Sequence, residues 1–338
     1  MSVTSIRGPY LLFLGAVRNP LDAKTGRGLK DWRPELCLGQ LRLPACTVDL
    51  GLPDMTPVQA YEAGARSLVI GVAPLGGDVS PDWVDTLVEA LEAGLDLVSG
   101  MHSRLGNVEK LRQAASQNDR TLVDIRVPPA GIPLATGKRR SGKRMLMVGT
   151  DCCVGKKYSA LALHRALQQQ GASTTFRATG QTGILIAGEG IPMDAVVSDF
   201  LAGAAEILSP ANWSEHWDVI EGQGSLFHPA YAAVTLGLLH GSQPDALVLC
   251  HDAGRKEIDD YPGFPIPPLD YCMQQYLEAA RVTNPKTRFI GISVNTSGLH
   301  PAERAAYLEQ VRTTTGLPCA DPLIDGVDSL LANLEQLS

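Results

Sequence analysis

The chain has 338 residues, of which 44% are hydrophobic and 5% aromatic, and its formal net charge is -7. That length predicts two domains, and the acidic balance argues against nucleic acid as a partner. Seven cysteines without regular spacing fit a reducing cytoplasm, and no apolar run approaches the roughly 18 residues of a membrane span. We therefore expect a soluble cytoplasmic protein with no membrane partner.

The first part of the chain alternates apolar strands with capped helices. Strands are expected over residues 10–14, 67–72, 96–99 and 121–126. Helices are expected after Thr56-Pro57, after Ser80-Pro81 and from about Val108. This alternation predicts a parallel, doubly wound α/β sheet. The glycine-punctuated basic stretch 24–30 is expected either to hold an anionic group or to be a solvated loop. No G-x-G-x-x-G follows the first strand, so a dinucleotide site is not supported.

A boundary is predicted near residue 130. Residues 131–143 are rich in Pro, Gly and basic side chains, so they are predicted to form a linker whose basic cluster is solvated. The predicted organisation is a first α/β domain over 1–130, the linker, and a second α/β domain over 144–338.

The second domain opens with a phosphate-binding pattern. A buried strand over 145–148 leads into Gly149-Thr150-Asp151-Cys152-Cys153-Val154-Gly155-Lys156, and a helix begins near Ser159. Backbone N–H groups, a helix N-terminus and a lysine converge on an anion in such a loop. Candidate cofactor-binding residues are Gly149, Thr150, Asp151, Cys152, Val154, Gly155, Lys156, Lys157, Tyr158 and Ser159.

Two positions depart from the pattern G-x-x-x-x-G-K-[S/T]. Thr150 stands where the first glycine is expected, and Lys157 replaces the hydroxyl residue that holds Mg²⁺. Ser159 is a candidate substitute for that hydroxyl. The alternative interpretation is an ordinary turn with an incidental Gly-Lys pair.

A second cluster follows the predicted strand 218–220. There Glu221 enters the glycine-rich turn Gly222-Gln223-Gly224, and His228 comes shortly after. In a parallel sheet this turn is expected beside the phosphate loop, where Glu221 would orient water or hold a metal and His228 would accept a proton. A capped turn with a core histidine is the alternative.

Polar residues also leave the ends of later strands. His251 and Arg255 follow the strand 245–250 and are candidates for binding a substrate carboxylate, because ligands sit at the carboxyl ends of parallel strands. Asn295 follows the strand 289–294 and is a candidate contact for a nucleobase or pantetheine.

Several long motifs resemble a known family. The loop 149–156 and Val219-Ile220-Glu221-Gly222-x-Gly224 are similar to motifs of the dethiobiotin synthetases. A closer resemblance, over nearly the whole chain, is to the D-glutamate N-acetyltransferase-like proteins, formerly a domain of unknown function. The further motifs that carry it are Gln181-Thr182-Gly183, Asp194 to Phe200, Glu221 to Pro229 and Val234 to Gly241.

This resemblance implies a Rossmann-like N-terminal domain and a P-loop NTPase-like C-terminal domain. It also implies an enzyme that moves an acetyl group from acetyl-CoA to the amine of a D-amino acid such as D-glutamate. Glu221 or His228 would be the catalytic base, and backbone N–H groups near Gly222 and Gly224 would stabilise the oxyanion. The P-loop would cradle the phosphates of CoA. Substrate-binding candidates are Arg177, Gln181, Thr182, His251 and Arg255.

Two alternatives remain open at this point. The first is an ATP-dependent, carboxylate-activating enzyme of dethiobiotin synthetase type, in which Asp151, Ser159 and Glu221 would hold Mg²⁺ with ATP as the cofactor. The second is a non-catalytic nucleotide-binding protein. For all three, a small-molecule substrate or ligand is expected, and a homo-oligomer is expected for the enzymes.

Overall fold

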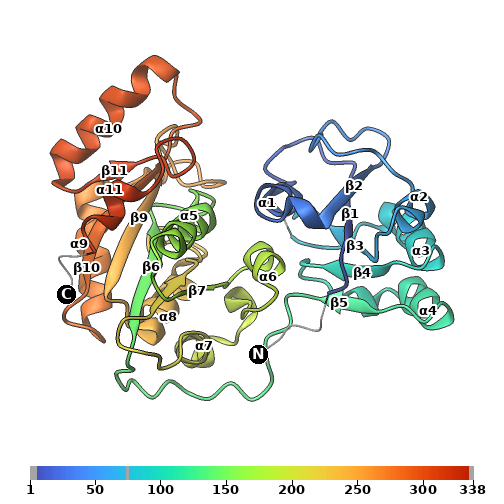
Figure 1. The fold of residues 1–338 in the computed structure, drawn as a ribbon, viewed down its shortest axis with the longest axis horizontal. Helices are drawn as coiled ribbons and strands as arrows, with labels where there is room; N and C mark the ends of the chain where they lie inside the picture. The colour runs from blue at the N-terminus through green and yellow to red at the C-terminus, as the bar shows by residue number, and fades with distance from the viewer. Residues whose placement is uncertain (1–5, 74–75, 335–338) are drawn as a thin grey trace. The chain divides into compact units, whose positions relative to one another are not determined.

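The computed structural model describes residues 6–73 and 76–334. The chain divides into two compact units, and each of them consists of two separate segments of the sequence. Unit 1 comprises Met1–Pro128 and Gln181–Pro192, and unit 2 comprises Pro129–Gly180 and Met193–Ser338. The helices and strands of each unit can be followed in Figure 1. No helix in the described part of the chain has the length and apolar character needed to cross a membrane.

Unit 1 is built on a five-stranded parallel sheet with the strand order β2-β1-β3-β4-β5. Its strands are β1 (Tyr10–Gly15), β2 (Cys37–Arg42), β3 (Ser67–Ile70), β4 (Asp96–Ser99) and β5 (Leu122–Asp124). Its α-helices are α1 (Lys24–Trp32), α2 (Pro57–Glu62), α3 (Val84–Glu92), α4 (Glu109–Gln117) and α6 (Gln181–Ala187). In Figure 1, α2, α3 and α4 lie on one side of this sheet and α1 on the other.

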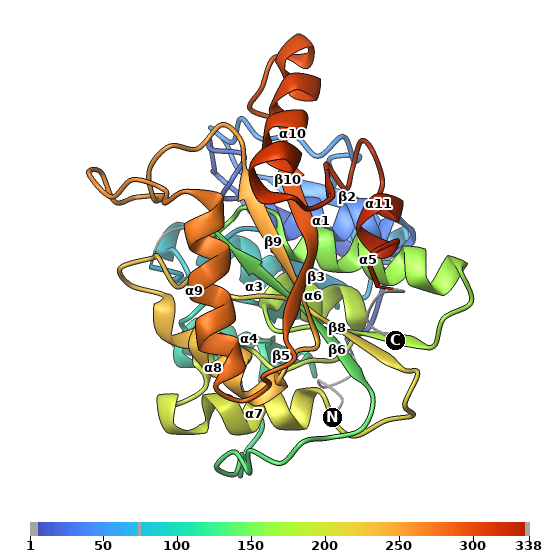
Figure 2. The same ribbon diagram turned by 90° about the vertical axis from the view of Figure 1, so that its left-hand side faces the viewer.

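Unit 2 is built on a six-stranded parallel sheet with the order β11-β10-β9-β6-β8-β7. Its strands are β6 (Lys143–Gly149), β7 (Thr174–Arg177), β8 (Trp217–Ile220), β9 (Ala246–Asp252), β10 (Arg288–Asn295) and β11 (Cys319–Ala320). Its α-helices are α5 (Lys156–Gln169), α7 (Leu201–Leu208), α8 (Ala232–Ser242), α9 (Leu269–Arg281), α10 (Pro301–Thr315) and α11 (Asp328–Leu331). Figure 2 shows α5 and α11 on one face of the sheet and α8 and α9 on the other.

The predicted fold class is confirmed, because both units are parallel α/β sheets with helices on both faces. The reason lies in the strands, which are nearly continuous apolar runs. Every residue of β1 is buried, and the side chains of Met145 to Val148 in β6 are at most 1% exposed. Strands covered on both faces have this pattern rather than an alternating one.

One segment predicted to be a loop is a helix, and this prediction was wrong. The stretch 24–30 lies in α1, where the Gly26 N–H donates to the carbonyl oxygen of Gly71 at 2.7 Å. A Cβ at Gly26 would lie 3.3 Å from that oxygen, so glycine allows this close contact despite its low helix propensity. Gln181 to Gly183 begin α6, whose residues 181–186 are all buried.

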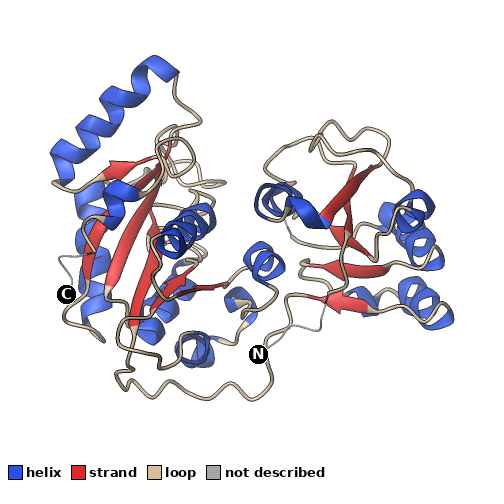
Figure 3. Ribbon diagram, viewed as in Figure 1, coloured by secondary structure: helices blue, strands red, loops and turns tan. Residues whose placement is uncertain are grey.

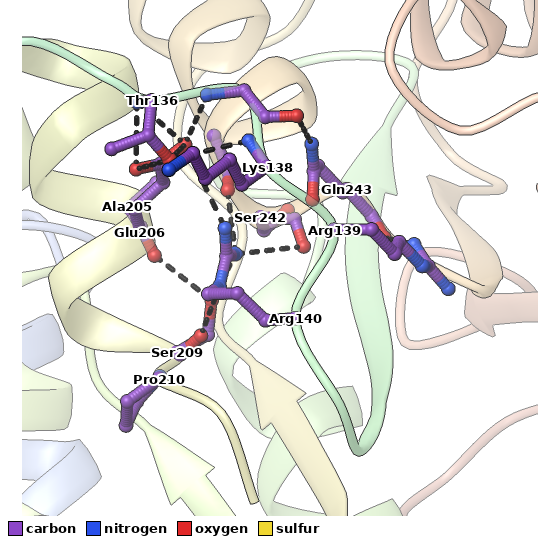
Figure 4. A network of polar contacts seen from close by, with 12 residues as sticks. Thr136, Lys138, Arg139, Arg140, Ala205, Glu206, Ser209, Pro210, Ser242 and Gln243 are labelled. Carbon is purple, nitrogen blue, oxygen red and sulfur yellow. Dashed lines mark hydrogen bonds and ion pairs between the residues drawn. The ribbon is translucent and has the colours of Figure 1, made fainter.

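The segment 129–142 contains no helix or strand, as Figure 3 shows, but it is attached to unit 2 by side chains. Arg140 donates to the carbonyl oxygen of Ser209 at 2.9 Å and lies 3.7 Å from the carboxylate of Glu206. That carboxylate also accepts from the Thr136 N–H at 2.9 Å (Figure 4). The prediction that the basic cluster is only solvated was therefore wrong, because its guanidinium groups bind the carbonyls at helix ends.

Candidate functional site

The loop between β6 and α5, residues 149–155, is the centre of the candidate site and is called the P-loop below. Gly155 ends it with φ +102°, a left-handed conformation that favours glycine, and α5 begins at the next residue. Cys153 also has a positive φ, +56°. Such a turn at the start of a 14-residue helix directs backbone N–H groups and the positive helix end toward one point.

Lys156 is the first residue of α5, and its side chain reaches back into the P-loop. Its side chain is 7% exposed, and its Nζ donates to the carbonyl oxygen of Asp151 at 2.7 Å. Gly222, after β8, packs against it, because a Cβ there would lie 2.9 Å from the Lys156 Cδ and 1.8 Å from the Met147 oxygen. Only glycine fits this close approach, so the two glycine-rich loops predicted to meet do meet.

Asp151 is completely buried and ion-paired. One carboxylate oxygen accepts from the Cys152 N–H at 2.6 Å, and the other accepts from Arg255 at 2.7 Å and from the Asp259 N–H at 2.8 Å. Arg255 also donates to the Cys152 carbonyl oxygen at 2.7 Å. Arg255 is therefore hydrogen-bonded to two residues of the P-loop. Its predicted contact with a substrate carboxylate stays a prediction.

Asp151, Cys152 and His228 form a side-chain cluster. One carboxylate oxygen, the sulfur and one ring nitrogen all lie within 4.8 Å of one another. The His228 side chain is 3% exposed, and its ring lies 4.5 Å from the Tyr231 ring and 5.0 Å from the Tyr261 ring, centroid to centroid.

The protonation state of His228 follows from its surroundings. Burial lowers the pKa of His228, and the charge of Asp151 only partly opposes this effect. Its Nδ1 accepts from the Ala230 N–H at 3.1 Å. A neutral ring that accepts at Nδ1 carries its proton on Nε2 and is therefore a hydrogen-bond donor at that atom.

Glu221 follows β8 and is 3% exposed. Its Oε2 accepts from the Thr179 N–H at 2.9 Å and the Gly180 N–H at 3.0 Å. Burial raises the pKa of Glu221, while these N–H groups and the charge of Lys157 lower it by less. A buried carboxylate with a raised pKa is suited to accept a proton near neutral pH.

The predicted Mg²⁺ ligands Asp151, Ser159 and Glu221 already form hydrogen bonds within the protein, and their role as metal ligands stays a prediction. The Ser159 hydroxyl donates to the Gly155 carbonyl oxygen at 3.0 Å and lies 2.7 Å from the Ser293 hydroxyl. The carboxylate of Asp151 is already neutralised by Arg255, and a guanidinium beside a metal site repels the metal. The side chain of Lys157 carries a further positive charge on the first turn of α5, with its Nζ 5.0 Å from the Tyr158 ring centre.

His251, in β9, contacts the P-loop through Thr150. Its Nδ1 is 3.0 Å from the Thr150 hydroxyl and its Nε2 is 2.8 Å from the Tyr307 hydroxyl. Burial lowers the pKa of His251 to about 4, so the ring is neutral at pH 7. Both nitrogens are engaged within unit 2, so His251 positions Thr150 here, and its substrate contact stays a prediction.

Two other predicted substrate and cofactor residues of unit 2 are bonded to neighbouring carboxylates. Arg177 donates to Asp218 at 2.7 Å, and Asn295 donates to Asp252 at 3.0 Å. These roles stay predictions.

Two predicted substrate residues belong to unit 1. The Thr182 hydroxyl lies 3.1 Å from that of Thr25. The buried Oε1 of Gln181 has no hydrogen-bond partner among the described residues, and it faces Gly100, where a Cβ would lie 1.7 Å away.

Sequence reasoning missed two residues that hold the P-loop. The Tyr276 hydroxyl donates to the Gly149 carbonyl oxygen at 2.7 Å and accepts from the Leu226 N–H at 3.2 Å. Ser225 donates to the same Gly149 oxygen at 2.9 Å. Ser225 lies within a quoted motif, but nothing in the local pattern distinguishes Tyr276 from a core aromatic of α9.

Comparisons with known proteins agree with this architecture. Residues 133–331 match the family described as "Domain of unknown function (DUF1611_C) P-loop domain". Residues 42–128 match "Domain of unknown function (DUF1611_N) Rossmann-like domain". A crystal structure of a DUF1611 family protein from Anabaena variabilis has a TM-score of 0.88 and 33% identity, and the match covers 97% of this chain and 99% of that one.

Two curated relatives are similar over almost their whole length. A protein of Tritonibacter scottomollicae is 49% identical over 326 residues, which is 96% of this chain and 98% of that protein. A protein of a Pseudoalteromonas species is 46% identical over 329 residues, which is 97% of this chain and 99% of that protein. Both are named "D-glutamate N-acetyltransferase".

Proposed function

This chain belongs to the DUF1611 family, and from that membership we propose that it transfers an acetyl group from acetyl-CoA to the amine of D-glutamate. The two relatives that match nearly the whole chain are named acetyltransferases, so the protein is an enzyme of that class. Donor and acceptor are our proposal. The observation that carries it is the buried carboxylate of Glu221, which lies at the same sheet edge as the P-loop and the start of α5.

Glu221 is the proposed base. An amine attacks a carbonyl carbon only after its ammonium form has lost a proton, and general-base catalysis of such a step contributes about 10²–10⁴-fold. The raised pKa of Glu221 makes it a stronger proton acceptor than an exposed glutamate. The two backbone N–H groups on Oε2 fix the orientation of the carboxylate.

His228 is the proposed donor rather than a base. Its Nδ1 accepts a backbone N–H, so the neutral ring has a proton only on Nε2. That N–H is suited to stabilise negative charge on the oxygen of a tetrahedral intermediate. The sequence left open whether Glu221 or His228 acts as the base, and the hydrogen bonds favour Glu221.

Two anions of this reaction suit the P-loop, the phosphates of CoA and a carboxylate of D-glutamate. The whole pantetheine arm separates the phosphates of CoA from its sulfur, so phosphates in the loop would hold the acetyl group away from Glu221 and His228. We therefore assign a carboxylate of the acceptor to the P-loop during transfer, since backbone nests bind carboxylates as well as phosphates.

Lys156→Ala tests this assignment against the predicted phosphate site. Titration calorimetry would measure binding of D-glutamate and of CoA separately to the native protein and to the variant. We expect D-glutamate affinity to fall about tenfold or more, the cost of one charge-assisted hydrogen bond, with little change for CoA. The reverse pattern would place the CoA phosphates in the P-loop.

The activity itself is tested by thiol release from acetyl-CoA across D- and L-amino acids, with the product identified by mass. The same protein would be assayed for phosphate release from ATP with Mg²⁺. Thiol release restricted to D-glutamate or close analogues is expected. Carboxylate-dependent phosphate release would instead support the ligase alternative, which the engaged Ser159 hydroxyl and Asp151 carboxylate do not favour.

A further inference from the structure

The proposed mechanism makes no use of the thiol of Cys152. This side chain is partly exposed, and its sulfur lies within 4.8 Å of a ring nitrogen of His228 and a carboxylate oxygen of Asp151. A cysteine whose sulfur lies near a histidine ring nitrogen, in a loop that leads into a helix N-terminus, has surroundings that suit a nucleophilic thiolate. The neighbouring Cys153 is exposed and is not part of this cluster.

The same three side chains resemble a set of metal ligands, but the charges around them do not suit a cation. Both oxygens of Asp151 already accept hydrogen bonds, and its charge is paired with Arg255 at 2.7 Å. The side chain of Lys156 reaches into the same loop. An anion rather than a metal ion complements this arrangement, and a thiolate is such an anion.

We propose that Cys152 is a catalytic nucleophile that takes the acetyl group from acetyl-CoA and passes it to the acceptor amine. This inference rests on the proposed function, because it specifies how that transfer proceeds. In the first step Cys152 reacts as a thiolate whose proton has passed to solvent. Its sulfur bonds to the acetyl carbon, the bond from that carbon to the CoA sulfur breaks, and CoA leaves as a thiolate. No oxidant or metal is needed, since one thioester replaces another.

In the second step the amine nitrogen of D-glutamate bonds to the acetyl carbon and the bond to the Cys152 sulfur breaks. Cys152 leaves as a thiolate, and the proton lost by the amine passes to Glu221. The Nε2–H of His228 is the donor that the ring offers to the anionic sulfur or to the developing oxyanion. Because CoA departs before the amine reacts, the P-loop is available to a carboxylate in this step.

The decisive measurement needs no variant. The native protein is mixed with acetyl-CoA in the absence of any amino acid, quenched in acid, and analysed by intact mass and peptide mapping. We expect a mass gain of one acetyl group at Cys152, its loss on addition of D-glutamate, and initial rates that give parallel double-reciprocal lines. Ping-pong kinetics of this kind accompany a covalent intermediate.

Cys152→Ser and Cys46→Ser, the latter at a partly exposed cysteine of unit 1, form a matched pair. We expect the first to reduce turnover at least 100-fold without loss of the folded circular dichroism spectrum, and the second to keep native turnover. A native protein that acetylates D-glutamate but carries no acetyl group on Cys152, together with an active Cys152→Ser variant, would overturn the relay and leave the proposed function intact. Acetyl-Cys152 that forms but is not discharged by D-glutamate would support the relay and refute the acceptor.

Discussion

At the scale of single residues, the proposed base Glu221 occupies a buried position that is unfavourable for a charged carboxylate. Burial disfavours its charged form, and two backbone N–H groups recover part of that cost. A raised pKa means that the folded protein holds this proton more tightly than the unfolded chain does. The stability that Glu221 contributes is therefore complete at a pH below the unfolded pKa and is lost as the pH rises through the folded pKa.

Glu221→Gln should separate activity from stability. The amide oxygen can still accept both N–H groups, but it cannot take a proton, so we expect kcat to fall about 10²–10⁴-fold. The free energy of unfolding should rise by about 1 kcal/mol at pH 8 and change much less at pH 4, where the carboxyl is mostly protonated in both states. Urea denaturation at both pH values measures this, with exposed Glu92→Gln as the control. Equal effects at pH 4 and pH 8 would contradict the assigned ionisation.

The site residues that could be predicted from the sequence are those that lie in local sequence motifs. A glycine-rich turn that follows a parallel strand lies at the carboxyl edge of the sheet. The sequence therefore predicts that two such turns lie side by side, with Gly155 and Lys156 in one and Glu221 and Gly222 in the other. The partner of Arg255 was not predictable, because its ion pair with Asp151 spans 104 positions of sequence. Ion pairs of that separation are set by the tertiary fold, which no local pattern encodes.

At the scale of elements, α9 holds the two loops of the site together through Tyr276. Its hydroxyl is fully buried and connects the end of β6 to the turn after β8, through Gly149 and Leu226. The geometry of the P-loop thus depends on a helix far from it in sequence.

Tyr276→Phe removes this connection without changing the packing of the ring. It leaves the Leu226 N–H without its partner, while the Gly149 oxygen keeps Ser225. We expect a loss of about 1–3 kcal/mol in the free energy of unfolding. Urea denaturation measures it, and Tyr271→Phe, about half exposed on the same helix, is the control. An unchanged midpoint would show that water replaces the hydroxyl.

The elements that sequence reasoning missed share one physical cause. α1 contains two buried glycines and α6 follows a glycine, so local propensity argues against helix in both. Both helices are stabilised by tertiary contact instead. Arg33 beyond the end of α1 donates to the Ile186 carbonyl oxygen in α6 at 2.7 Å, and such contacts are invisible to periodicity.

At the scale of the whole molecule, the chain passes between the units more than once. A division near residue 130 follows from composition, because Pro and Gly gather there. The return of 181–192 to unit 1 has no such signal, since these residues lie between elements of the P-loop unit in sequence. Unit 1 is therefore incomplete when it is cut at the first boundary.

A pair of fragments tests this consequence. A fragment of residues 1–128 lacks α6, whereas a second fragment adds residues 181–192 through a flexible Gly/Ser linker. Ile184, Leu185 and Ile186 are at most 6% exposed, and a fully buried side chain of this type contributes about 1.5–3 kcal/mol. We expect the second fragment to unfold at a clearly higher temperature, by calorimetry or circular dichroism, and expect Ile184→Asp in it to cancel the gain. A flexible Gly/Ser linker has no ordered structure, and closing it costs little conformational entropy. A difference in melting temperature between the two fragments is therefore due to residues 181–192 rather than to the linker. Equal melting temperatures for the two fragments would mean that residues 1–128 fold without α6, and that the segment joins unit 1 only after unit 1 is complete.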